Sequence, residues 1–196
     1  MDIPKSKYLS WLLRHGGKGH GLAMDPAGWM SVDAVLEFSK ISRAELELIV
    51  NTNQKHRFQL LGNSIRACQG HSLDAGVTRE ALEASWVKYV ADTSIWHGTS
   101  VTAIEQIARE GIVPMHRTHV HCALTKDSAV GKRANVDVLL EISPAKIRAV
   151  GLDIFIAPNG VVLVRRVPQD AIIDVLPMTK KAGKRESAMR AALGFR

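Results

Sequence analysis

Arginine and histidine follow directly on an apolar helical pattern in the stretch LSWLLRHGGKGHG, residues 9–21. Arg14 and His15 stand in what would be the last turn of that helix. A planar guanidinium group can bind two phosphate oxygens at once, and an imidazole can gain or lose a proton near neutral pH. Arg57 of the stretch NQKHRF could converge with these two residues, because a hairpin wing packs beside the helices that precede it. For any one arginine, a solvated surface position is the simpler interpretation; the group as a whole could bind a phosphate.

A second group of residues suited to chemistry lies further along the chain. WHGT, residues 96–99, places a histidine, a turn and a hydroxyl group at the end of an expected strand, and RTHVHCALT alternates His119 and His121 onto one strand face. A metal site is an alternative reading of these histidines. Its ligands would be His116, His119, His121 and Cys122, but no carboxylate or second cysteine pair completes a usual ligand set, so we expect no metal.

The composition is that of an ordinary folded protein. The chain has 196 residues, 46% of them hydrophobic, which suffices for one sizeable core or two small ones. No apolar run approaches the roughly 20 residues of a membrane helix, and the start MDIPKSKY lacks the apolar core of a signal peptide. Cys68 and Cys122 form no CxxC pair. We therefore expect a cytoplasmic, monomeric protein with reduced thiols.

The charge balance favours a polyanionic partner. The net charge is +7, and lysines and arginines that neutralise phosphates release counterions and so raise affinity. Part of the excess lies in the terminal stretch KKAGKRESAMRAALGFR, for which a solvated helix or arm is the simpler interpretation.

Three helices are expected in the first part of the chain. The first would end in a left-handed cap at Gly16, the second would begin after Ser31 as N-cap, and the third would begin at a capping box formed by Ser42 and Glu45. Apolar residues at helical spacing in the first two indicate their inward faces: Leu9, Leu12, Leu13, Val32, Val35 and Leu36.

A hairpin is expected next, in RFQLLGNSIRA, with a tight turn at Gly62-Asn63. Pairing across that turn sets Phe58, Leu60, Ile65 and Ala67 on one face and Arg57, Gln59 and Arg66 on the other. Three helices followed by a hairpin predict a winged-helix lobe over residues 1–76.

The pattern changes after GHSLDAGVTRE, whose small and polar residues indicate a linker. SIWHGTS, HVHCAL, VDVLLEIS and GVVLVRRV are typical of strands, and VTAIEQIAREGI of a helix with Ile104, Ile107 and Ala108 inward. We therefore expect a second, sheet-rich lobe over residues 77–196, and an α+β fold for the whole chain.

Taken in order, several motifs resemble the RNA 2′-phosphotransferase family, enzymes that use NAD to remove the 2′-phosphate left at a transfer-RNA splice junction. The motifs are LSWLLRHG, GW, RF, IRACQGHS, WHGT, GIVPMHRTHVH, VGKR and APNGVVL, and they cover nearly the whole chain. The resemblance implies an N-terminal winged-helix lobe, a C-terminal ADP-ribosyltransferase-like lobe that binds NAD, and an active site between the two.

The resemblance also implies roles for individual residues. It makes Arg14, His15 and Arg57 of the first lobe and Arg117 of the second catalytic, and His97, Gly98, Thr99 and His121 the NAD-binding residues. Further basic residues of the first lobe are candidates for contacts with the RNA backbone, and His71 for either an RNA contact or a cap of the interlobe turn. The basic candidates are Lys18, Lys55 and Arg66.

The reaction implied has two steps. The RNA 2′-phosphate first attacks the nicotinamide-bearing carbon of NAD and releases nicotinamide; the ribose 2″-hydroxyl then attacks that phosphate, giving 2′-hydroxyl RNA and ADP-ribose 1″,2″-cyclic phosphate. NGVVLV offers no glutamate to activate a nucleophile, and a phosphate monoester with a pKa of about 6 needs none because it is already a dianion.

Two other functions are alternatives. One is an ADP-ribosyltransferase that acts on another acceptor, an RNA end or a protein; the phosphate-binding arginines argue against it. The other is a winged-helix regulator that binds nucleic acid. Its third helix, in SRAELELIVNTN, carries two glutamates and one arginine, which is unfavourable in a groove lined by phosphates.

Overall fold

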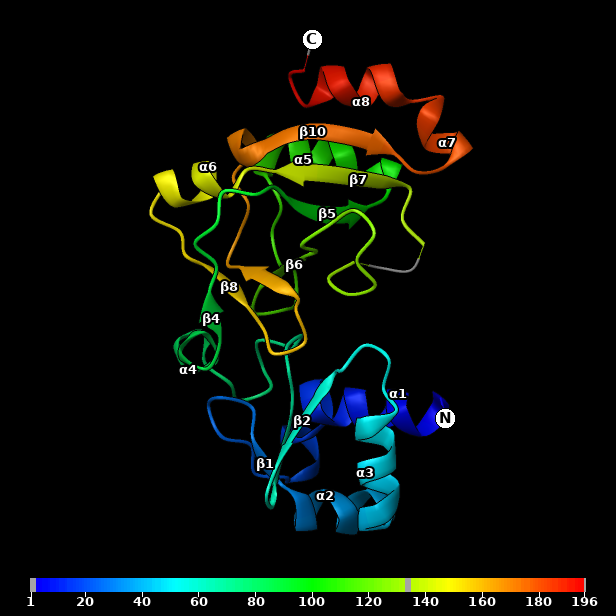
Figure 1. Ribbon diagram of the computed structural model, residues 1–196, viewed down its shortest axis with the longest axis vertical. Helices are drawn as coiled ribbons and strands as arrows, with labels where there is room; N and C mark the ends of the chain where they lie inside the picture. Colours follow the sequence, from blue (N-terminus) through cyan, green and yellow to red (C-terminus); the bar gives the residue numbers. More distant parts are fainter. Residues whose placement is uncertain (1–2, 133–134, 196) are drawn as a thin grey trace. The chain divides into compact units, whose positions relative to one another are not determined.

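The computed structural model describes residues 3–132 and 135–195 (Figure 1). Helices and strands are mixed along the chain, so the fold is α+β, as predicted. Contacts divide the chain into two units. Unit 1 comprises the residues up to Val87 together with His116–Thr118, and unit 2 comprises Lys88–Met115 and His119 onward. Relative to the predicted boundary after residue 76, unit 1 thus gains residues 77–87 and a short segment from far along the chain.

Unit 1 combines helices with a three-stranded sheet of order β1-β3-β2. Its helices and strands contribute to one apolar core, in which Leu12, Val32 and Leu46 are fully buried. The elements in chain order are α1 (Ile3–Trp11), a π-helical turn η1 (Leu12–Gly16), η2 (Lys18–His20), β1 (Met30–Ser31), α2 (Val32–Ser39), α3 (Arg43–Asn51), β2 (Phe58–Leu61), β3 (Ser64–Ala67) and α4 (Arg79–Ala84).

Two local predictions for unit 1 are confirmed. The Ser42 hydroxyl accepts the N–H of Glu45, and the Glu45 carboxylate accepts the N–H of Ser42, which is the predicted capping box of α3. In the hairpin, β2 and β3 pair antiparallel as expected: Phe58 lies opposite Ala67, Gln59 opposite Arg66, and Leu60 opposite Ile65.

The predicted ends of the first two helices need correction. Gly16 has no left-handed backbone; the chain instead continues α1 as a π turn, in which the N–H of Gly17 donates to the carbonyl oxygen of Leu12. Ser31 occupies the N-cap position of α2, but its hydroxyl makes no capping bond. The first N–H of that helix donates to the carbonyl oxygen of Asn63, so the hairpin turn completes the helix start.

The stretch GHSLDAGVTRE is not a linker, contrary to the prediction. His71 and Ala75 are buried, and the N–H of Ser72 donates to the carbonyl oxygen of Arg14 at 3.2 Å. Thr78 then caps α4 by accepting the N–H of Ala81. Small and polar residues stand here because the segment packs closely against η1, a contact that composition does not reveal.

Unit 2 contains two sheets, of order β10-β7-β5 and β4-β8-β9-β6. They are joined where Trp96 and Ala123 exchange backbone hydrogen bonds of 2.9 and 2.7 Å. The elements are β4 (Val87–Lys88), which starts at the last residue of unit 1, β5 (Ile95–Thr99), η3 (Val101–Ala103), α5 (Ile104–Glu110), β6 (Val120–Cys122), β7 (Val138–Ile142), α6 (Pro144–Ala149), β8 (Ile154–Ile156), β9 (Val162–Val164), η4 (Gln169–Ala171), β10 (Ile172–Pro177), α7 (Lys180–Gly183) and α8 (Glu186–Ala192).

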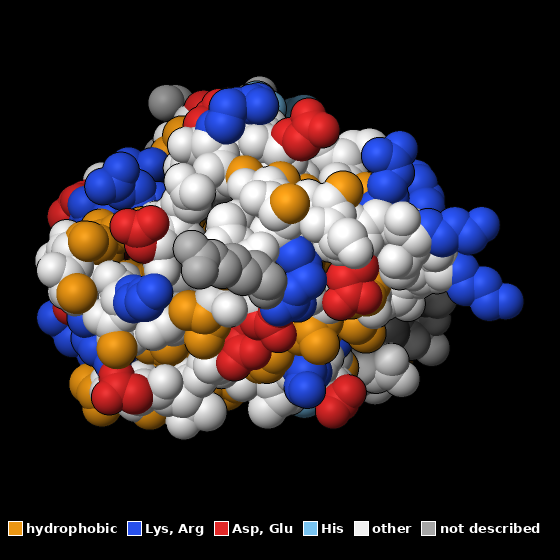
Figure 2. Space-filling model, turned by 90° about the horizontal axis from the view of Figure 1, so that it is seen from above, with side chains coloured by type: hydrophobic (Ala, Val, Ile, Leu, Met, Phe, Trp, Pro, Cys, Tyr) orange, Lys and Arg blue, Asp and Glu red, His pale blue; other side chains and the backbone are white. Residues whose placement is uncertain are grey.

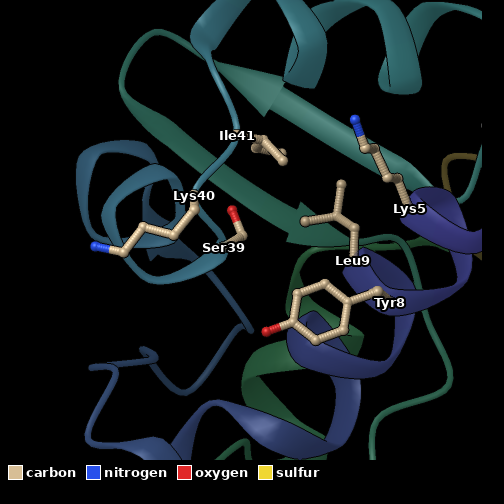
Figure 3. A pocket seen from close by; sticks show the side chains of 6 residues that line it. All are labelled: Lys5, Tyr8, Leu9, Ser39, Lys40 and Ile41. Carbon is tan, nitrogen blue, oxygen red and sulfur yellow. The ribbon is translucent and has the colours of Figure 1, made fainter.

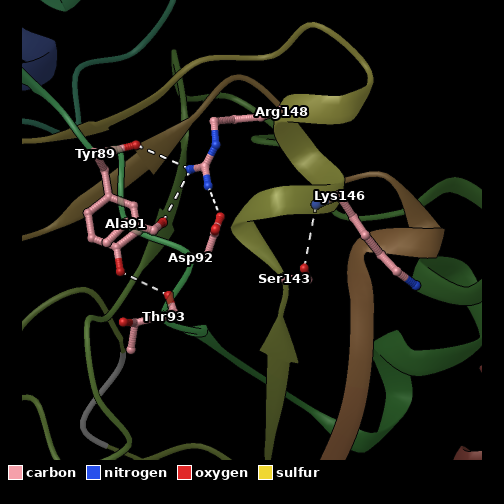
Figure 4. Close-up of polar contacts among 7 residues, drawn as sticks. All are labelled: Tyr89, Ala91, Asp92, Thr93, Ser143, Lys146 and Arg148. Atoms are coloured by element: carbon pink, nitrogen blue, oxygen red, sulfur yellow. Dashed lines mark hydrogen bonds and ion pairs between the residues drawn. The ribbon is translucent and has the colours of Figure 1, made fainter.

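Arg148 of α6 fixes the irregular segment between β4 and β5 (Figure 4). Its guanidinium donates to the carbonyl oxygens of Tyr89 and Ala91 and pairs with the carboxylate of Asp92. The Tyr89 hydroxyl in turn donates to the carbonyl oxygen of Thr93. This network leads the chain into β5, which carries the WHGT motif.

The basic end of the chain is packed rather than a free arm. Met189 and Leu193 are buried in the core of unit 2, and Arg190 forms an ion pair of 2.8 Å with Asp174 of β10. On the face that includes α7 and α8, lysine and arginine side chains are interspersed with acidic ones (Figure 2). None of the helices in the described part of the chain is long and apolar enough to span a membrane.

Candidate active site

Arg14 is held in unit 1 by contacts on both its backbone and its side chain. The π turn places it between buried apolar residues, and its carbonyl oxygen accepts the N–H of Ser72. Gly70 has a φ of +90°, and a Cβ atom there would lie 3.3 Å from Cζ and Nε of Arg14. The backbone at Gly70 therefore lies flat against the guanidinium group, an approach that only glycine allows without strain.

Three arginines concentrate positive charge at this point. The pKa of Arg14 is lowered to about 10, first by burial and then by the charges of Arg117 and Arg57. The Nε atom of Arg14 is buried and has no hydrogen-bond partner among the described residues. A buried donor left without an acceptor is costly, so this cluster is suited to an anion supplied by a ligand.

Arg57 is oriented by the turn that precedes β2. Asn53 is buried and donates to the hydroxyl of Ser6 at 2.9 Å, while its side-chain oxygen accepts the N–H of Arg57 at 3.2 Å. The carbonyl oxygen of Arg57 accepts the N–H of Cys68 at 2.8 Å. These bonds fix the backbone of Arg57 on both sides. They do not involve its half-buried side chain, which can therefore contact a ligand.

Arg117 reaches the cluster through the short segment that belongs to unit 1. It forms an isolated antiparallel bridge with Ser72, and the carbonyl oxygen of His116 accepts the N–H of Leu73 at 3.3 Å. The N–H of Thr118 donates to the carbonyl oxygen of His71 at 3.2 Å. The resemblance implied that Arg117 comes from the second lobe; the segment that carries it instead packs with the first.

His15 follows Arg14 in the same turn and is exposed. Its pKa is lowered from 6.5 by partial burial and by the charges of Arg14 and Arg117, against an opposing effect of Asp74. The imidazole is therefore mainly neutral at pH 7, a state in which one ring nitrogen donates and the other accepts a hydrogen bond.

The residues expected to bind NAD lie in unit 2, on β5 and β6. Nδ1 of His97 lies 2.9 Å from the carbonyl oxygen of His121. Because a carbonyl can only accept, Nδ1 of His97 carries the proton and Nε2 is the acceptor. A Cβ at Gly98 would lie 2.5 Å from Val136, so glycine is required there. The carbonyl oxygen of Thr99 accepts the N–H of Asp137.

The comparisons with known proteins show the family of the chain. A model of the RNA 2′-phosphotransferase, Tpt1 / KptA family matches residues 1–166. The chain belongs to the RNA 2′-phosphotransferase family. It is thus a transferase of the family that removes the 2′-phosphate from RNA.

Curated relatives carry the name "Probable RNA 2′-phosphotransferase". One from Rhizobium johnstonii is 36% identical over 175 residues, which cover 86% of this chain and 91% of the relative. One from Pseudomonas fluorescens is 37% identical over 172 residues, covering 83% and 91%. One from Nostoc punctiforme is 36% identical over 176 residues, covering 84% and 92%. The chain is therefore similar to these relatives over most of their length.

Of the three basic residues expected to contact RNA, Arg66 has a structural role in this phosphotransferase. Its side chain is buried, donates to Gln59 at 2.7 Å, to Ala27 at 3.1 Å and to Ser85 at 2.9 Å, and lies over the ring of Trp29. Lys55 is half-buried. The side chain of Lys18 lies outside the described residues.

His71 is the residue of this phosphotransferase that sequence reasoning assigned least clearly. It is wholly buried, and its pKa is lowered to about 3 by burial and by the charges of Arg14 and Arg66. Neither ring nitrogen has a hydrogen-bond partner among the described residues, and a Cβ at Gly28 would lie 2.6 Å from Nε2. The motif QGHS drew attention to His71, but the contact with Gly28 joins positions too far apart in sequence to be read from a pattern.

No cluster among the described residues matches the alternative of a metal site. Within residues 3–132 and 135–195, no three histidine, cysteine, aspartate or glutamate side chains are grouped so that they could hold an ion. Cys122 is fully buried, which raises the pKa of its thiol to about 12.

Proposed function

We propose that this protein removes an internal 2′-phosphate from RNA, as at a transfer-RNA splice junction, by transferring it to NAD. The products are RNA with a 2′-hydroxyl, ADP-ribose 1″,2″-cyclic phosphate and nicotinamide. The observation that carries the proposal is the convergence of Arg14, Arg57 and Arg117 in unit 1, with a buried and unpartnered donor on Arg14.

The helices and strands of the two units match those expected for this function. Helices α1 to α3 and the β2–β3 hairpin of unit 1 support a winged-helix lobe, and the two joined sheets of unit 2 support an ADP-ribosyltransferase-like lobe. The proposal assigns RNA and its phosphate to unit 1 and NAD to unit 2.

The residues of β5 fit NAD. β5 is the edge strand of its sheet, and Trp96 directs its backbone groups outward, to Ala123. Because these directions alternate along a strand, the N–H and C=O of Gly98 lie on the same edge, where they can bind a planar amide such as that of nicotinamide. In the proposal His97, whose Nδ1 donates to the carbonyl oxygen of His121, lies beside the ribose of NAD. When bound, NAD supplies the electrophilic ribose carbon and nicotinamide as leaving group.

The phosphate needs orientation more than activation. A monoester whose second pKa is about 6 is a dianion at neutral pH, so no carboxylate base is required. In the proposal the guanidinium groups of Arg14, Arg57 and Arg117 bind the phosphate oxygens and stabilise the charge that gathers on them as the phosphate leaves the RNA. Neutral His15 hydrogen-bonds the phosphate or moves a proton at the departing 2′-oxygen.

The reaction can be tested directly with the purified protein. A short RNA carrying one internal 2′-phosphate is incubated with and without NAD, in the presence of a chelator. Loss of the 2′-phosphate only with NAD, with ADP-ribose cyclic phosphate appearing, supports the proposal. Accumulation of ADP-ribosylated RNA would assign the chain the first step only, and unchanged RNA under every condition would overturn the proposal.

A further inference from the structure

Four aromatic rings form a continuous row on unit 1. Tyr8 and Trp11 lie one turn apart on α1, with ring centroids 5.9 Å apart. Trp11 meets His20 edge-on at 5.5 Å, and His20 lies 5.0 Å from Phe38 of α2. These four side chains are called the aromatic row.

The row is open to solvent. Tyr8 and Trp11 are 42% and 43% exposed, whereas Trp86 and Trp96 are 7% and 8% exposed. Large rings contribute to folding stability by being buried, so the exposed part of these two neighbouring rings adds little to it. Contiguous exposed apolar groups of this kind mark binding surfaces.

A pocket adjoins the row at Tyr8. It has a volume of about 310 Å³ and lies between α1 and the turn that follows α2 (Figure 3). Leu9 and Ile41 give it apolar walls, and Lys5 and Lys40 stand on opposite sides of it. Lys5 pairs with Glu45 at 2.8 Å, so Lys40 is the lysine of the pocket that has no ion pair among the described residues. The side chains that line it in the described part of the chain include no carboxylate. The pocket therefore favours an uncharged flat group attached to an anionic chain.

The row also leads to the arginine cluster. A Cβ at Gly16 would lie 2.7 Å from the ring of Trp11, so the indole covers the residue that follows His15. Trp11 therefore lies close in the chain to Arg14, within reach of a nucleotide that neighbours a 2′-phosphate bound there. Unpaired bases stack on aromatic side chains regardless of sequence, while lysines bind the phosphates between them.

We propose that the aromatic row and its pocket bind unpaired bases that flank the 2′-phosphate of the substrate. The inference rests on the proposed function for RNA as the substrate, and adds a preference for single strands to it. Bases in a duplex already stack on one another and cannot lie on the row. The partner is thus single-stranded or looped RNA.

Binding can be measured with a labelled single-stranded RNA octamer that carries one internal 2′-phosphate. A matched octamer lacks the bases on either side of that nucleotide. By fluorescence anisotropy, we expect the protein to bind the intact octamer about tenfold more tightly, the order of effect of one stacked base. Tyr8→Ala should weaken binding of the intact octamer about five- to tenfold and change binding of the abasic one much less.

Leu48→Ala is the matched control. Leu48 is 62% exposed on α3 of the same unit and lies outside the row, so its variant should bind both octamers as the unchanged protein does. Thermal unfolding of each variant shows whether it is folded, and His20→Ala provides a second test within the row.

Equal affinity for the two octamers would overturn the inference, as would unchanged binding in both row variants. If Tyr8→Ala instead lowered the mass seen in sedimentation and left RNA affinity intact, the row would be a contact between two copies. The abasic octamer separates this result from the proposed function, because it keeps the internal 2′-phosphate but lacks the flanking bases. Its turnover with NAD by the unchanged protein supports the function even when the inference fails.

Discussion

Burial and neighbouring charge act on Arg14 together, yet a pKa of about 10 leaves its guanidinium charged at pH 7. The three cations therefore repel one another, and in the proposed function the phosphate dianion offsets this repulsion. The backbone of Arg57 is held by Asn53 and Cys68 and not by its own side chain, so we expect its replacement to change charge with little change in structure.

Replacing Arg57 with alanine should lower kcat for 2′-phosphate removal by about 100- to 1,000-fold, the usual effect of one preorganised donor. NAD affinity should stay nearly unchanged, because the proposed NAD residues are in unit 2. Turnover and NAD binding are measured separately. The control is Arg43→Ala, which removes an exposed arginine of unit 1 that pairs with Glu47. Full activity of Arg57→Ala would refute the assignment.

His71 should make stability depend on pH. Its pKa is about 3 in the folded protein against 6.5 when unfolded, so the unfolded chain binds more protons between these values. The contribution of neutral His71 to the free energy of unfolding is complete above pH 6.5. It falls as the pH drops below that value, by up to about 1.4 kcal/mol per pH unit. Chemical denaturation between pH 7 and 5 should show a smaller loss in His71→Asn than in the unchanged protein. Parallel curves would contradict the lowered pKa.

At the level of elements, close backbone packing shapes the proposed NAD region. Gly131 of the VGKR motif has a φ of +81°, and a Cβ there would lie 2.1 Å from the carbonyl oxygen of Cys122 in β6. Gly160, in the turn between β8 and β9, has a similar φ of +78°, but its nearest neighbour is Val130 at 4.0 Å. The two glycines share a conformation and differ in the space around them.

Comparing alanine variants of Gly131 and Gly160 separates the cost of a strained backbone from the cost of a crowded side chain. Gly160→Ala should cost about 1 kcal/mol for its left-handed backbone. Gly131→Ala should cost about 1–3 kcal/mol more, because β6 or the loop must shift, and it should also weaken NAD binding. Chemical denaturation and NAD titration of both variants provide the measurements. Equal losses of stability in the two variants would show that the loop around Gly131 shifts without a measurable cost.

Features that depend on residues a few positions apart in the sequence could be predicted. Features that depend on contacts between distant residues could not. The capping box of Ser42 and the register about Gly62 depend on residues a few positions apart, and both are confirmed. The π turn at Gly16 depends on the ring of Trp11, and the burial of Arg66 on Ala27 and Ser85. Motifs named the candidate site residues, but the packing that holds His71 and Arg14 is formed only in the fold.

For the whole molecule, the two units have separate apolar cores. A ligand that binds one folded unit should stabilise that unit first. NAD at 100 times its Kd should raise the opening free energy of amides in β5 and β7 by up to about 2.7 kcal/mol and leave α3 unchanged. Adenosine 2′-monophosphate should do the reverse.

Hydrogen exchange measures both effects in one sample. His97→Ala should abolish the protection given by NAD and keep that given by the nucleotide 2′-phosphate. Protection of α3 by NAD to the same extent as β5 would show that the units open together, and would place NAD differently from the proposal.

The chain passes between its units three times: after Val87, after Met115 and after Thr118. A fragment that ended at Val87 would keep the core of unit 1 but only two of the three clustered arginines. The segment that carries Arg117 is joined to unit 2 at both of its ends. Neither unit is therefore a single continuous stretch of the chain. A single cut after Val87 or after Met115 would separate Arg117 from Arg14 and Arg57, so a gene fusion or domain exchange at either junction would divide the cluster proposed to bind phosphate.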